Sequence, residues 1–306
     1  MTHRSGFVAL VGRPNAGKST LTNALVGHKV AITSSKPQTT RHAIRGILTK
    51  GDGQIVLVDT PGIHRPRTLL GERLNALVYD TWSGVDVIVL CLPADEEIGA
   101  GDRFIAARAA EMKNKTVFAV LTKTDKVDKK ALAQRLLDAV SLGTSLGIDF
   151  AHVVPVSAVA GDQVSLLADL LINTLPEGPA LFPEGELTDE STDQLIAETV
   201  REAALEGVHD ELPHSIAVVV EDIELREGRP LDRPLHDVRV SLFVERDSQK
   251  AIIIGKAGAR LKEIGTRARP RISDIVGTPV HLDLRVKVAP DWQQDPKQLR
   301  RLGFDS

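Results

Sequence analysis

Four residues near the N-terminus have the types and the spacing that hold the phosphates of a nucleotide. Gly12, Gly17, Lys18 and Ser19 match the pattern G-x-x-x-x-G-K-[ST] within the segment GRPNAGKS. The glycines let backbone N–H groups face the phosphate oxygens, Lys18 can reach the β- and γ-phosphates, and the Ser19 hydroxyl can ligate Mg²⁺. An apolar run (7–12) precedes the pattern and a helical pattern follows it. We therefore predict a phosphate loop, with a chance glycine–lysine turn as the alternative.

Two further segments could complete this site. DTPG (59–62) ends an apolar strand pattern, so the Asp59 carboxylate can reach Mg²⁺ through a water molecule and the Gly62 N–H can approach the γ-phosphate. The polar loop SSKPQTTRH (34–42) precedes that strand, and a threonine in it could close over the metal and the γ-phosphate. The alternatives are a strand end capped by Asp59 and an ordinary surface loop.

The segments TKTD (122–125) and VSA (156–158) carry groups that could select the base. The Asp125 carboxylate can accept two hydrogen bonds from guanine, whereas adenine would present an acceptor to it. The aliphatic stem of Lys123 can lie over the base, and the Ala158 N–H can meet the guanine carbonyl. A mismatched base leaves polar groups unpaired, so this set predicts GTP rather than ATP. Alone, T-K-x-D could be a helix cap, but ligands bind at the carboxyl ends of strands in such sheets.

A second glycine loop, GKAG (255–258), lies in the segment IIIGKAGARLK. No Ser or Thr follows its lysine, so it is not a nucleotide loop. G-x-x-G between an apolar segment and a helix is typical of a KH domain, where it lets the backbone of a single-stranded nucleic acid come close. The alternative is a glycine-capped turn followed by a solvated basic helix.

Basic residues surround this second loop. Between Lys250 and Arg271 the only acidic residue is Glu263, and such a patch suits phosphate contacts although the net charge of the chain is −3. We predict that Lys256 and Arg260 contact the nucleic-acid backbone. The basic residues of this stretch are Lys250, Lys256, Arg260, Lys262, Arg267, Arg269 and Arg271. Ile253 and Ile254 are predicted to line the apolar floor on which bases rest.

The elements that must position the first set of groups alternate along the first half of the chain. Apolar strand patterns occur at 7–12, 43–50, 54–60, 85–92, 116–123 and 152–158, with helical patterns after the phosphate loop and near 69–82, 102–112, 128–146 and 163–174. Such alternation predicts an α/β fold, a mostly parallel sheet with helices on both faces.

The composition changes after this half. Residues 175–191 are rich in Pro, Gly and acidic residues and lack periodicity, and we predict a G domain at 1–176, a linker at 177–191 and a smaller α+β domain at 192–306. With its G-x-x-G loop, this second domain resembles a type II KH domain. Within the second domain, Pro270 and Gly265 interrupt a helical pattern, so we expect a kinked or broken helix between Gly258 and Val276. Trp292 and Leu302 in the C-terminal tail should pack on this domain.

The composition restricts the class of protein further. The 306 residues include a single cysteine, Cys91, in an apolar run that suits core packing, so a disulfide framework is excluded. No apolar run reaches the roughly 18 residues that span a bilayer. The N-terminal segment does not resemble a signal peptide. We expect a reducing, intracellular compartment.

The phrases GRPNAGKSTLTNALVG, PQTTRH, DTPGIH and IIIGKAGARLKEIG resemble the Era family of bacterial TRAFAC-class GTPases over essentially the full chain. The resemblance implies binding of GTP and GDP with Mg²⁺, and GTP hydrolysis in which Lys18, Thr40 and Gly62 act. It also implies that Thr40, rather than Thr39, joins Ser19 and Asp59 at the metal. The predicted nucleotide site comprises Gly12, Arg13, Pro14, Asn15, Ala16, Gly17, Lys18, Ser19, Thr20, Asp59, Thr60, Pro61, Gly62, Thr122, Lys123, Thr124, Asp125, Ser157 and Ala158.

Two positions depart from the wider GTPase pattern. Thr122 replaces an Asn that normally braces the phosphate loop, and a hydroxyl can supply only one such bond. Ile63 replaces the Gln that orients the attacking water in many GTPases, so we expect slow intrinsic hydrolysis. Some relatives with an Asn at the position of Asn15 use K⁺ near the phosphates, and we hypothesise the same here. Arg13 and Arg41 are weaker candidates for an arginine finger.

The resemblance further implies binding to the 3′ end of 16S rRNA and a role in maturation of the 30S ribosomal subunit, as a cytoplasmic monomer. The predicted RNA-binding residues are Ile253, Ile254, Gly255, Lys256, Ala257, Gly258, Arg260 and Lys262. Two alternatives stay open. One is a GTPase that acts mainly through a membrane or a signalling protein, although a peripheral position on the inner face of the cell membrane is also compatible with the RNA-binding function. The other is an RNA chaperone with a vestigial nucleotide site, which the intact phosphate-loop and guanine motifs argue against.

Overall fold

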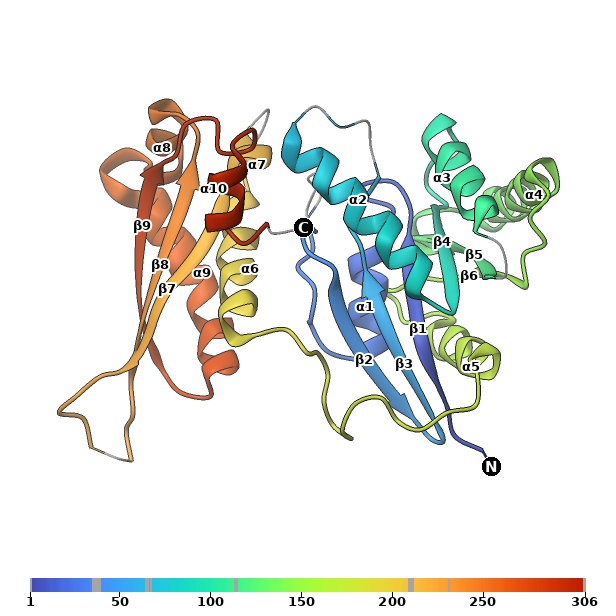
Figure 1. Ribbon diagram of the computed structural model, residues 1–306, viewed down its shortest axis with the longest axis horizontal. Coiled ribbons are helices and arrows are strands. Elements are labelled where there is room, and N and C mark those ends of the chain that lie inside the picture. Colours follow the sequence, from blue (N-terminus) through green and yellow to red (C-terminus); the bar gives the residue numbers. More distant parts are fainter. Residues whose placement is uncertain are drawn as a thin grey trace. The chain divides into compact units, whose positions relative to one another are not determined.

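The chain folds into two compact units (Figure 1). The computed structural model describes residues 2–34, 40–63, 66, 68–112, 115–208, 212–230 and 232–304. The first unit comprises Met1–Pro66 and Gly71–Asp189, and the second comprises Arg67–Leu70 and Glu190–Ser306. Among the described helices, none is long and apolar enough to cross a membrane.

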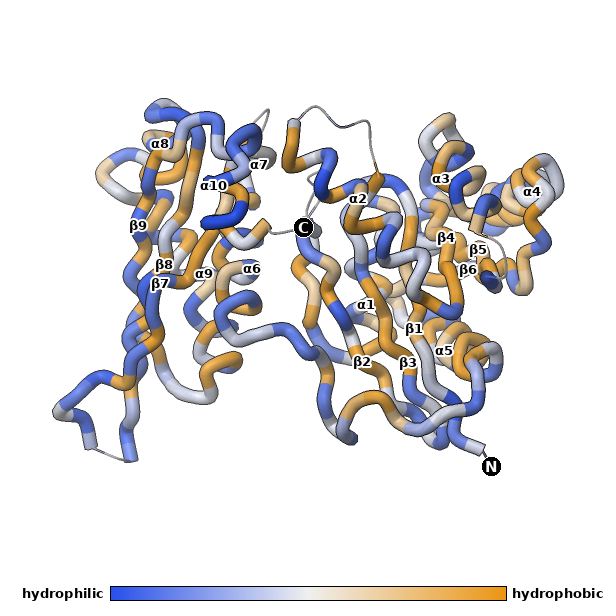
Figure 2. Tube along the Cα trace, viewed as in Figure 1, coloured by the Kyte–Doolittle hydropathy of each residue, from blue (hydrophilic) through white to orange (hydrophobic). Residues whose placement is uncertain are grey.

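A six-stranded sheet of order β2-β3-β1-β4-β5-β6 forms the centre of the first unit. Its strands are β1 (Arg4–Val11), β2 (Ile44–Lys50), β3 (Gly53–Asp59), β4 (Val87–Pro93), β5 (Thr116–Thr122) and β6 (His152–Pro155). Every strand pair is parallel except β2 with β3. The predicted mostly parallel sheet is therefore confirmed, and β3 and β4 are apolar runs because both of their faces are covered (Figure 2).

Helices cover both faces of this sheet. They are α1 (Lys18–Val26), α2 (Leu69–Gly84), α3 (Ala100–Glu111), α4 (Lys129–Leu146) and α5 (Val164–Thr174). Alternate residues of β1 belong to two different cores because side chains of a strand point to opposite faces. Val8 and Leu10 pack with residues of α1 and α5, whereas Ala9 and Val11 pack with residues of α2, α3 and α4. The carboxyl ends of β1, β3, β5 and β6 are thus held at one edge by two apolar layers.

The segment predicted as a linker (177–191) is hydrogen-bonded to the first unit. The Gln54 side chain accepts bonds from the N–H groups of Leu181 and Phe182 and donates to the Phe182 carbonyl. The Ile47 N–H donates to the Leu187 carbonyl at 2.8 Å. Most of this stretch is therefore bound to strands β2 and β3, and the chain divides after Asp189.

The second unit is an α+β fold with a three-stranded sheet of order β7-β8-β9. Its elements are α6 (Thr192–Leu205), α7 (Leu212–Ser215), β7 (Ala217–Leu225), β8 (His236–Val244), α8 (Asp247–Ile254), the 3₁₀ turn η2 (Lys256–Gly258), α9 (Ala259–Val276), β9 (Val280–Val288) and α10 (Pro296–Arg301). Residues of α6, α8 and α9 share one core with the inward side chains of β8 and β9. As predicted, Trp292 and Leu302 are buried, and the Trp292 indole donates to the Ser215 carbonyl at 2.9 Å.

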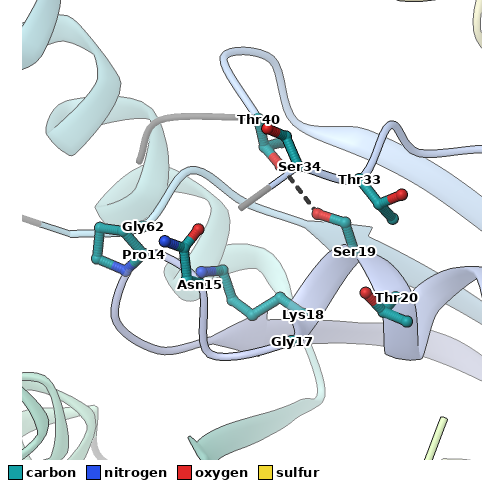
Figure 3. A pocket seen from close by; sticks show the side chains of 10 residues that line it. All are labelled: Pro14, Asn15, Gly17, Lys18, Ser19, Thr20, Thr33, Ser34, Thr40 and Gly62. Atoms are coloured by element: carbon teal, nitrogen blue, oxygen red, sulfur yellow. Dashed lines mark hydrogen bonds between the residues drawn. The ribbon is translucent and has the colours of Figure 1, made fainter. Parts of the chain in front are cut away.

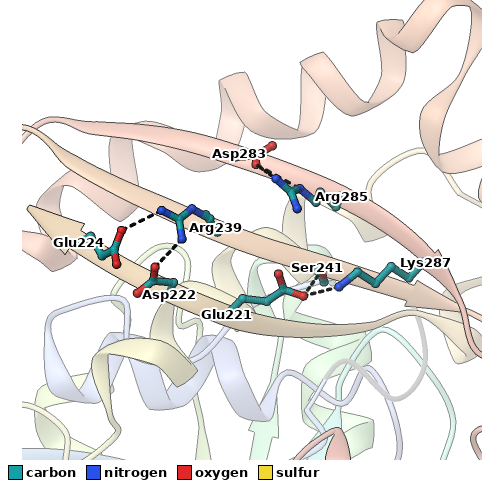
Figure 4. Close-up of polar contacts among 8 residues, drawn as sticks. All are labelled: Glu221, Asp222, Glu224, Arg239, Ser241, Asp283, Arg285 and Lys287. Carbon is teal, nitrogen blue, oxygen red and sulfur yellow. Dashed lines mark hydrogen bonds and ion pairs between the residues drawn. The ribbon is translucent and has the colours of Figure 1, made fainter. Parts of the chain in front are cut away.

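The outer face of this small sheet carries a ladder of charge pairs across its strands (Figure 4). Arg239 of β8 pairs with Asp222 and Glu224 of β7 at 2.6 and 2.7 Å. Glu221 accepts a bond from Ser241 and pairs with Lys287 of β9. Side chains alternate along a strand, and an irregularity of β7 between Val220 and Asp222 lets the consecutive residues Glu221 and Asp222 both lie opposite the apolar core.

Helix α9 continues through Pro270, so the expected break is absent. It is one helix of 18 residues, Ala259–Val276. Pro270 is exposed, while Ile264, Ala268 and Ile272 on the opposite side are buried in the core. The burial of this apolar face outweighs the lost amide donor and the crowding of the ring against the preceding turn.

We predict that Pro270→Ala stabilises the second unit. The substitution restores a helical N–H donor and removes the ring, and it gives back some unfolded-state entropy, for a net gain of roughly 1–2 kcal/mol. Urea unfolding followed by circular dichroism measures this, with Arg269→Ala as the control at an exposed position of the same turn. An unchanged or lower midpoint for Pro270→Ala would contradict the prediction.

Candidate nucleotide and nucleic-acid sites

The phosphate loop joins the end of β1 to the start of α1. Gly17 caps the helix with a left-handed backbone (φ 87°), and the buried Lys18 ammonium donates to the carbonyls of Gly12 and Arg13 at 3.1 and 3.0 Å. A pocket opens beside this loop (Figure 3). It is lined by Pro14, Asn15, Gly17, Lys18, Ser19, Thr20, Thr33, Ser34, Thr40 and Gly62. Thr33 and Ser34 were not predicted as site residues, although their hydroxyls directly follow an apolar run.

Three oxygen atoms gather at one end of this pocket. Ser19 Oγ and Thr40 Oγ1 donate to Asp59 Oδ2 at 2.6 and 3.2 Å, and the two hydroxyl oxygens lie 3.1 Å apart. Neighbouring ligands of an octahedral Mg²⁺, each at about 2.1 Å, lie about 3 Å apart, so the two hydroxyls fit adjacent positions. Asp59 Oδ1 is buried and, among the described residues, has no hydrogen-bond partner. The set therefore fits a hard divalent cation, with Asp59 Oδ1 available to a metal-bound water.

Burial shifts the pKa values of two charged groups at this pocket, Asp59 and Lys18, in opposite directions. Desolvation raises the pKa of Asp59, against the opposing effects of Lys18 and of the hydrogen bonds from Ser19 and Thr40. Desolvation also lowers the pKa of Lys18, although Asp59 favours its charged form. A cation beside the carboxylate and a phosphate beside the ammonium would favour the charged form of each group.

The DTPG turn lies directly on the phosphate loop. A Cβ atom on Gly62 would stand 2.7 Å from the Pro14 nitrogen and 2.9 Å from its Cα, so only glycine fits this approach. The Thr60 hydroxyl anchors the turn by donating to the Leu10 carbonyl at 3.0 Å. Ile63 is buried among the apolar residues between the sheet and helices α2–α4, which agrees with its having no part in positioning water.

The two segments that could read the base meet beside the phosphate loop. Ser157 Oγ donates to Asp125 Oδ1 at 2.6 Å and accepts the Ala160 N–H, so the carboxylate is oriented by a buried hydroxyl. Thr122 Oγ1 donates to the Ala16 carbonyl at 2.6 Å, which is the single brace expected of a hydroxyl. Lys123 has a left-handed backbone (φ 56°) and leads into the 3₁₀ turn η1 (Thr124–Lys126).

Neither candidate arginine finger is among the described residues that line the pocket. Arg41 is only 1% exposed. Arg13 is paired with Asp102 at 2.7 Å and with Glu96 at 3.0 Å. Thr40 is placed at the oxygen cluster, whereas the alternative Thr39 lies outside the described residues.

The GKAG loop is a tight reversal between α8 and α9. Gly255, Ala257 and Gly258 all have positive φ values, of 72°, 50° and 79°. A Cβ on Gly255 would stand 2.9 Å from the Arg260 nitrogen, so this glycine brings the start of α9 against the loop. Lys256, Ala257 and Lys262 are exposed around it.

Two residues predicted at the RNA site are turned inward. Ile253 is fully buried in the core of the second unit, and Ile254 packs partly against that core, so Ile253 cannot form a floor for bases. The exposed apolar side chain is Ile252, at 55%. Sequence alone did not separate them because three successive isoleucines precede the glycine. Arg260 donates to the Glu206 carbonyl and to Glu263, so its guanidinium is engaged within the unit.

The fold and the phosphate pocket define a P-loop GTPase domain followed by a KH domain. The model of a 50S ribosome-binding GTPase family matches residues 7–123, and a KH domain model matches residues 211–293. GTPase Era of a Nocardioides strain and of Streptomyces coelicolor are each 63% identical over 302 residues, covering 99% of this chain and 96% and 95% of theirs. The chain therefore belongs to the Era family of GTPases.

Solved structures of the family have the same fold over the full chain. Era in complex with MgGDPNP and nucleotides 1506–1542 of 16S ribosomal RNA is 37% identical, with a TM-score of 0.93, over 99% of this chain and 100% of that one. A variant of Aquifex aeolicus Era bound to GDP and AlF₄⁻ is also 37% identical, with a TM-score of 0.91 and the same coverage.

We predict that Thr122→Val weakens the binding of GDP. Valine has the same shape but leaves the buried Ala16 carbonyl without its partner, a loss of about 1–3 kcal/mol that destabilises the ordered phosphate loop. Nucleotide binding must then order this loop, so the Kd should rise by roughly fivefold. Titration with a fluorescent GDP derivative measures this. Thr122→Ser keeps the hydroxyl and serves as the control. Equal Kd values for Val and Ser would contradict a bracing role.

Proposed function

We propose that this chain binds GTP with Mg²⁺ and hydrolyses it to GDP and phosphate in the pocket beside the phosphate loop. The observation that carries the proposal is the cluster of Ser19, Thr40 and Asp59 oxygens, all within 3.2 Å of one another, next to the buried Lys18 ammonium. When bound there, Mg²⁺ would neutralise charge on the β- and γ-phosphates. Asp125, oriented by Ser157, would select guanine.

The chain's own groups would divide the work of hydrolysis. Lys18 would hold the charge that develops on the phosphate oxygens, and the Gly62 N–H would approach the γ-phosphate, which the close packing of Gly62 on Pro14 supports. Thr40 would link the first switch loop to the metal. The residue directly after Gly62 is Ile63, which is buried and cannot hydrogen-bond through its side chain, so turnover should be slow.

We further propose that K⁺ assists this reaction through Asn15. Asn15 lines the pocket together with Lys18 and Gly62, and an amide oxygen is a suitable ligand for such a cation (Figure 3). GTP turnover should then be about tenfold faster in KCl than in NaCl at equal ionic strength, since one further positive charge acts on the transition state. Asn15→Ala should remove this difference. Equal wild-type rates in the two salts would overturn the proposal.

We propose that the second unit binds the 3′ end of 16S rRNA and that the protein thereby assists maturation of the 30S subunit, as a cytoplasmic monomer. The relative whose structure holds nucleotides 1506–1542 of 16S rRNA shares the fold over the full chain, which supports this target. The GKAG loop, with Lys256 and Lys262 exposed beside it, supports contact with an RNA backbone.

Crosslinking of a 16S 3′-end oligonucleotide, in the presence of a GTP analogue and of GDP, tests this proposal. A binding titration at several salt concentrations gives a second readout, the slope of log Kobs against log salt concentration. Each lysine that contacts a phosphate of single-stranded RNA contributes about 0.7 to the size of this slope, so the double variant Lys256→Gln with Lys262→Gln should reduce it by about 1.4. Arg229→Gln, an exposed cation of the β7–β8 connection, is the matched control. Failure to retain the RNA in either nucleotide state would contradict the function, and retention of a protein or a membrane instead would favour the alternative partner class.

A further inference from the structure

The connection between β4 and α3 contains three successive carboxylates that hydrolysis does not use. Asp95, Glu96 and Glu97 follow Pro93, the last residue of β4, at the edge of the sheet where the nucleotide loops lie. Two of the three face cations of those loops. The inference below rests on the proposed GTP-binding function and concerns how the site is held in shape.

On the phosphate side, Arg13 is fixed by two carboxylates. Its Nε donates to Asp102 Oδ1 at 2.7 Å, and its Nη1 lies 3.0 Å from Glu96 Oε2. Asp102 is only 1% exposed, and its other oxygen accepts the Gly99 N–H at the start of α3. A Cβ on Gly101 would stand 2.8 Å from Arg13 Cδ, so α3 also packs closely on the arginine stem. The phosphate loop is therefore tied to the first turn of α3.

On the guanine side, the same connection holds Lys123. Its Nζ lies 3.3 Å from Asp95 Oδ1 and 3.9 Å from Glu96 Oε1, while Lys126 approaches Asp95 at 3.3 Å. The Ala94 N–H adds a backbone bond to the Thr122 carbonyl at 2.9 Å. Glu96 thus faces a cation of each loop, Arg13 through one oxygen and Lys123 through the other.

Alternating charges connect the two loops through this set. The sequence of contacts is Asp102, Arg13, Glu96, Lys123 and Asp95. The Glu96 side chain is 47% exposed, so its pairs alone are weak surface interactions. Asp102 is different, because a buried carboxylate that lost its guanidinium partner would be left uncompensated. The buried Asp102 therefore fixes Arg13, and the exposed Glu96 links Arg13 to Lys123.

We propose that Asp102, Glu96 and Asp95 form an acidic brace that keeps the phosphate loop and the guanine loop at a fixed separation, so that the two loops bind a guanine nucleotide as one preorganised unit. These are positioning residues, since none of them lines the described pocket. The brace acts on the parts of the nucleotide that GTP and GDP share. It also engages Arg13, which excludes this arginine as a finger in this arrangement.

The first test compares Asp102→Asn, Glu96→Gln and the matched control Glu97→Gln. Asparagine can still accept the Gly99 N–H but loses the charge pair, so Asp102→Asn should weaken GDP and a GTP analogue alike by about tenfold, and Glu96→Gln by about threefold. Glu97, 88% exposed and 3.7 Å from Arg135, should have no effect. For GTP hydrolysis, KM should rise while kcat stays within about twofold of the wild-type value. This is expected when an interaction that binds substrate and transition state equally is lost. Melting temperatures of the unliganded proteins separate this from unfolding.

The second test changes a residue beside the guanine loop and measures binding at the phosphate loop. Asp95 shares Lys123 with Glu96, so Asp95→Asn should draw Lys123 onto Glu96 and loosen the Glu96–Arg13 pair. Binding of magnesium pyrophosphate, which has no base, should then weaken about two- to threefold, measured by competition with fluorescent GDP.

Unchanged pyrophosphate affinity in Asp95→Asn would overturn the brace, as would equal GDP affinity in Glu96→Gln and Glu97→Gln. A fall in kcat with unchanged KM would also overturn it, because the residues would then act on the reaction itself. Wild-type protein that bound no guanine nucleotide would instead overturn the proposed GTP-binding function.

Discussion

The burial of two opposite charges, Lys18 and Asp59, at one end of an apolar sheet is the constraint on which the first unit depends. Taking either charge out of water costs several kcal/mol, and their mutual attraction does not reliably repay that cost. Asp59 ends strand β3 and Lys18 begins helix α1 directly after β1, and both strands pack into apolar cores, so the fold has core stability to offset the cost. The arrangement makes sense as one completed by a bound anion and cation rather than as a source of stability.

Close backbone approach is the second requirement, and glycine meets it differently in the two units. Gly62 allows the DTPG turn to touch Pro14, so hydroxyl and carboxylate oxygens converge on a small volume. Gly255 instead allows the start of α9 to fold against the loop, which leaves Lys256 and Ala257 exposed. Neighbouring turns enclose the phosphate loop, which suits a mononucleotide. The GKAG loop is open, which suits a single strand of RNA.

Periodicity and motif spacing predicted the strands, the parallel sheet and the segments that surround the phosphate pocket, because these depend on local pattern. Side-chain direction within a uniform apolar run is a different matter, as Ile252 and Ile253 illustrate, since only the packing of α8 decides which one is buried. Pro270 in α9 shows tertiary burial overriding a strong local preference. The pairing of Arg13 with Asp102 joins positions far apart in sequence, and no local pattern in Arg13 or Asp102 predicts it.

The charge ladder on the outer face of the small sheet has an electrostatic consequence. Acids and bases there are paired across Glu221, Arg239 and Lys287, so this face presents little net charge to a polyanion. At the GKAG loop, by contrast, Lys256 and Lys262 are exposed. The attraction of such lysines for phosphate is screened over roughly 8 Å at physiological salt, so it acts at short range. A paired face and an exposed basic loop thus favour the holding of a polyanion at the loop rather than across the sheet.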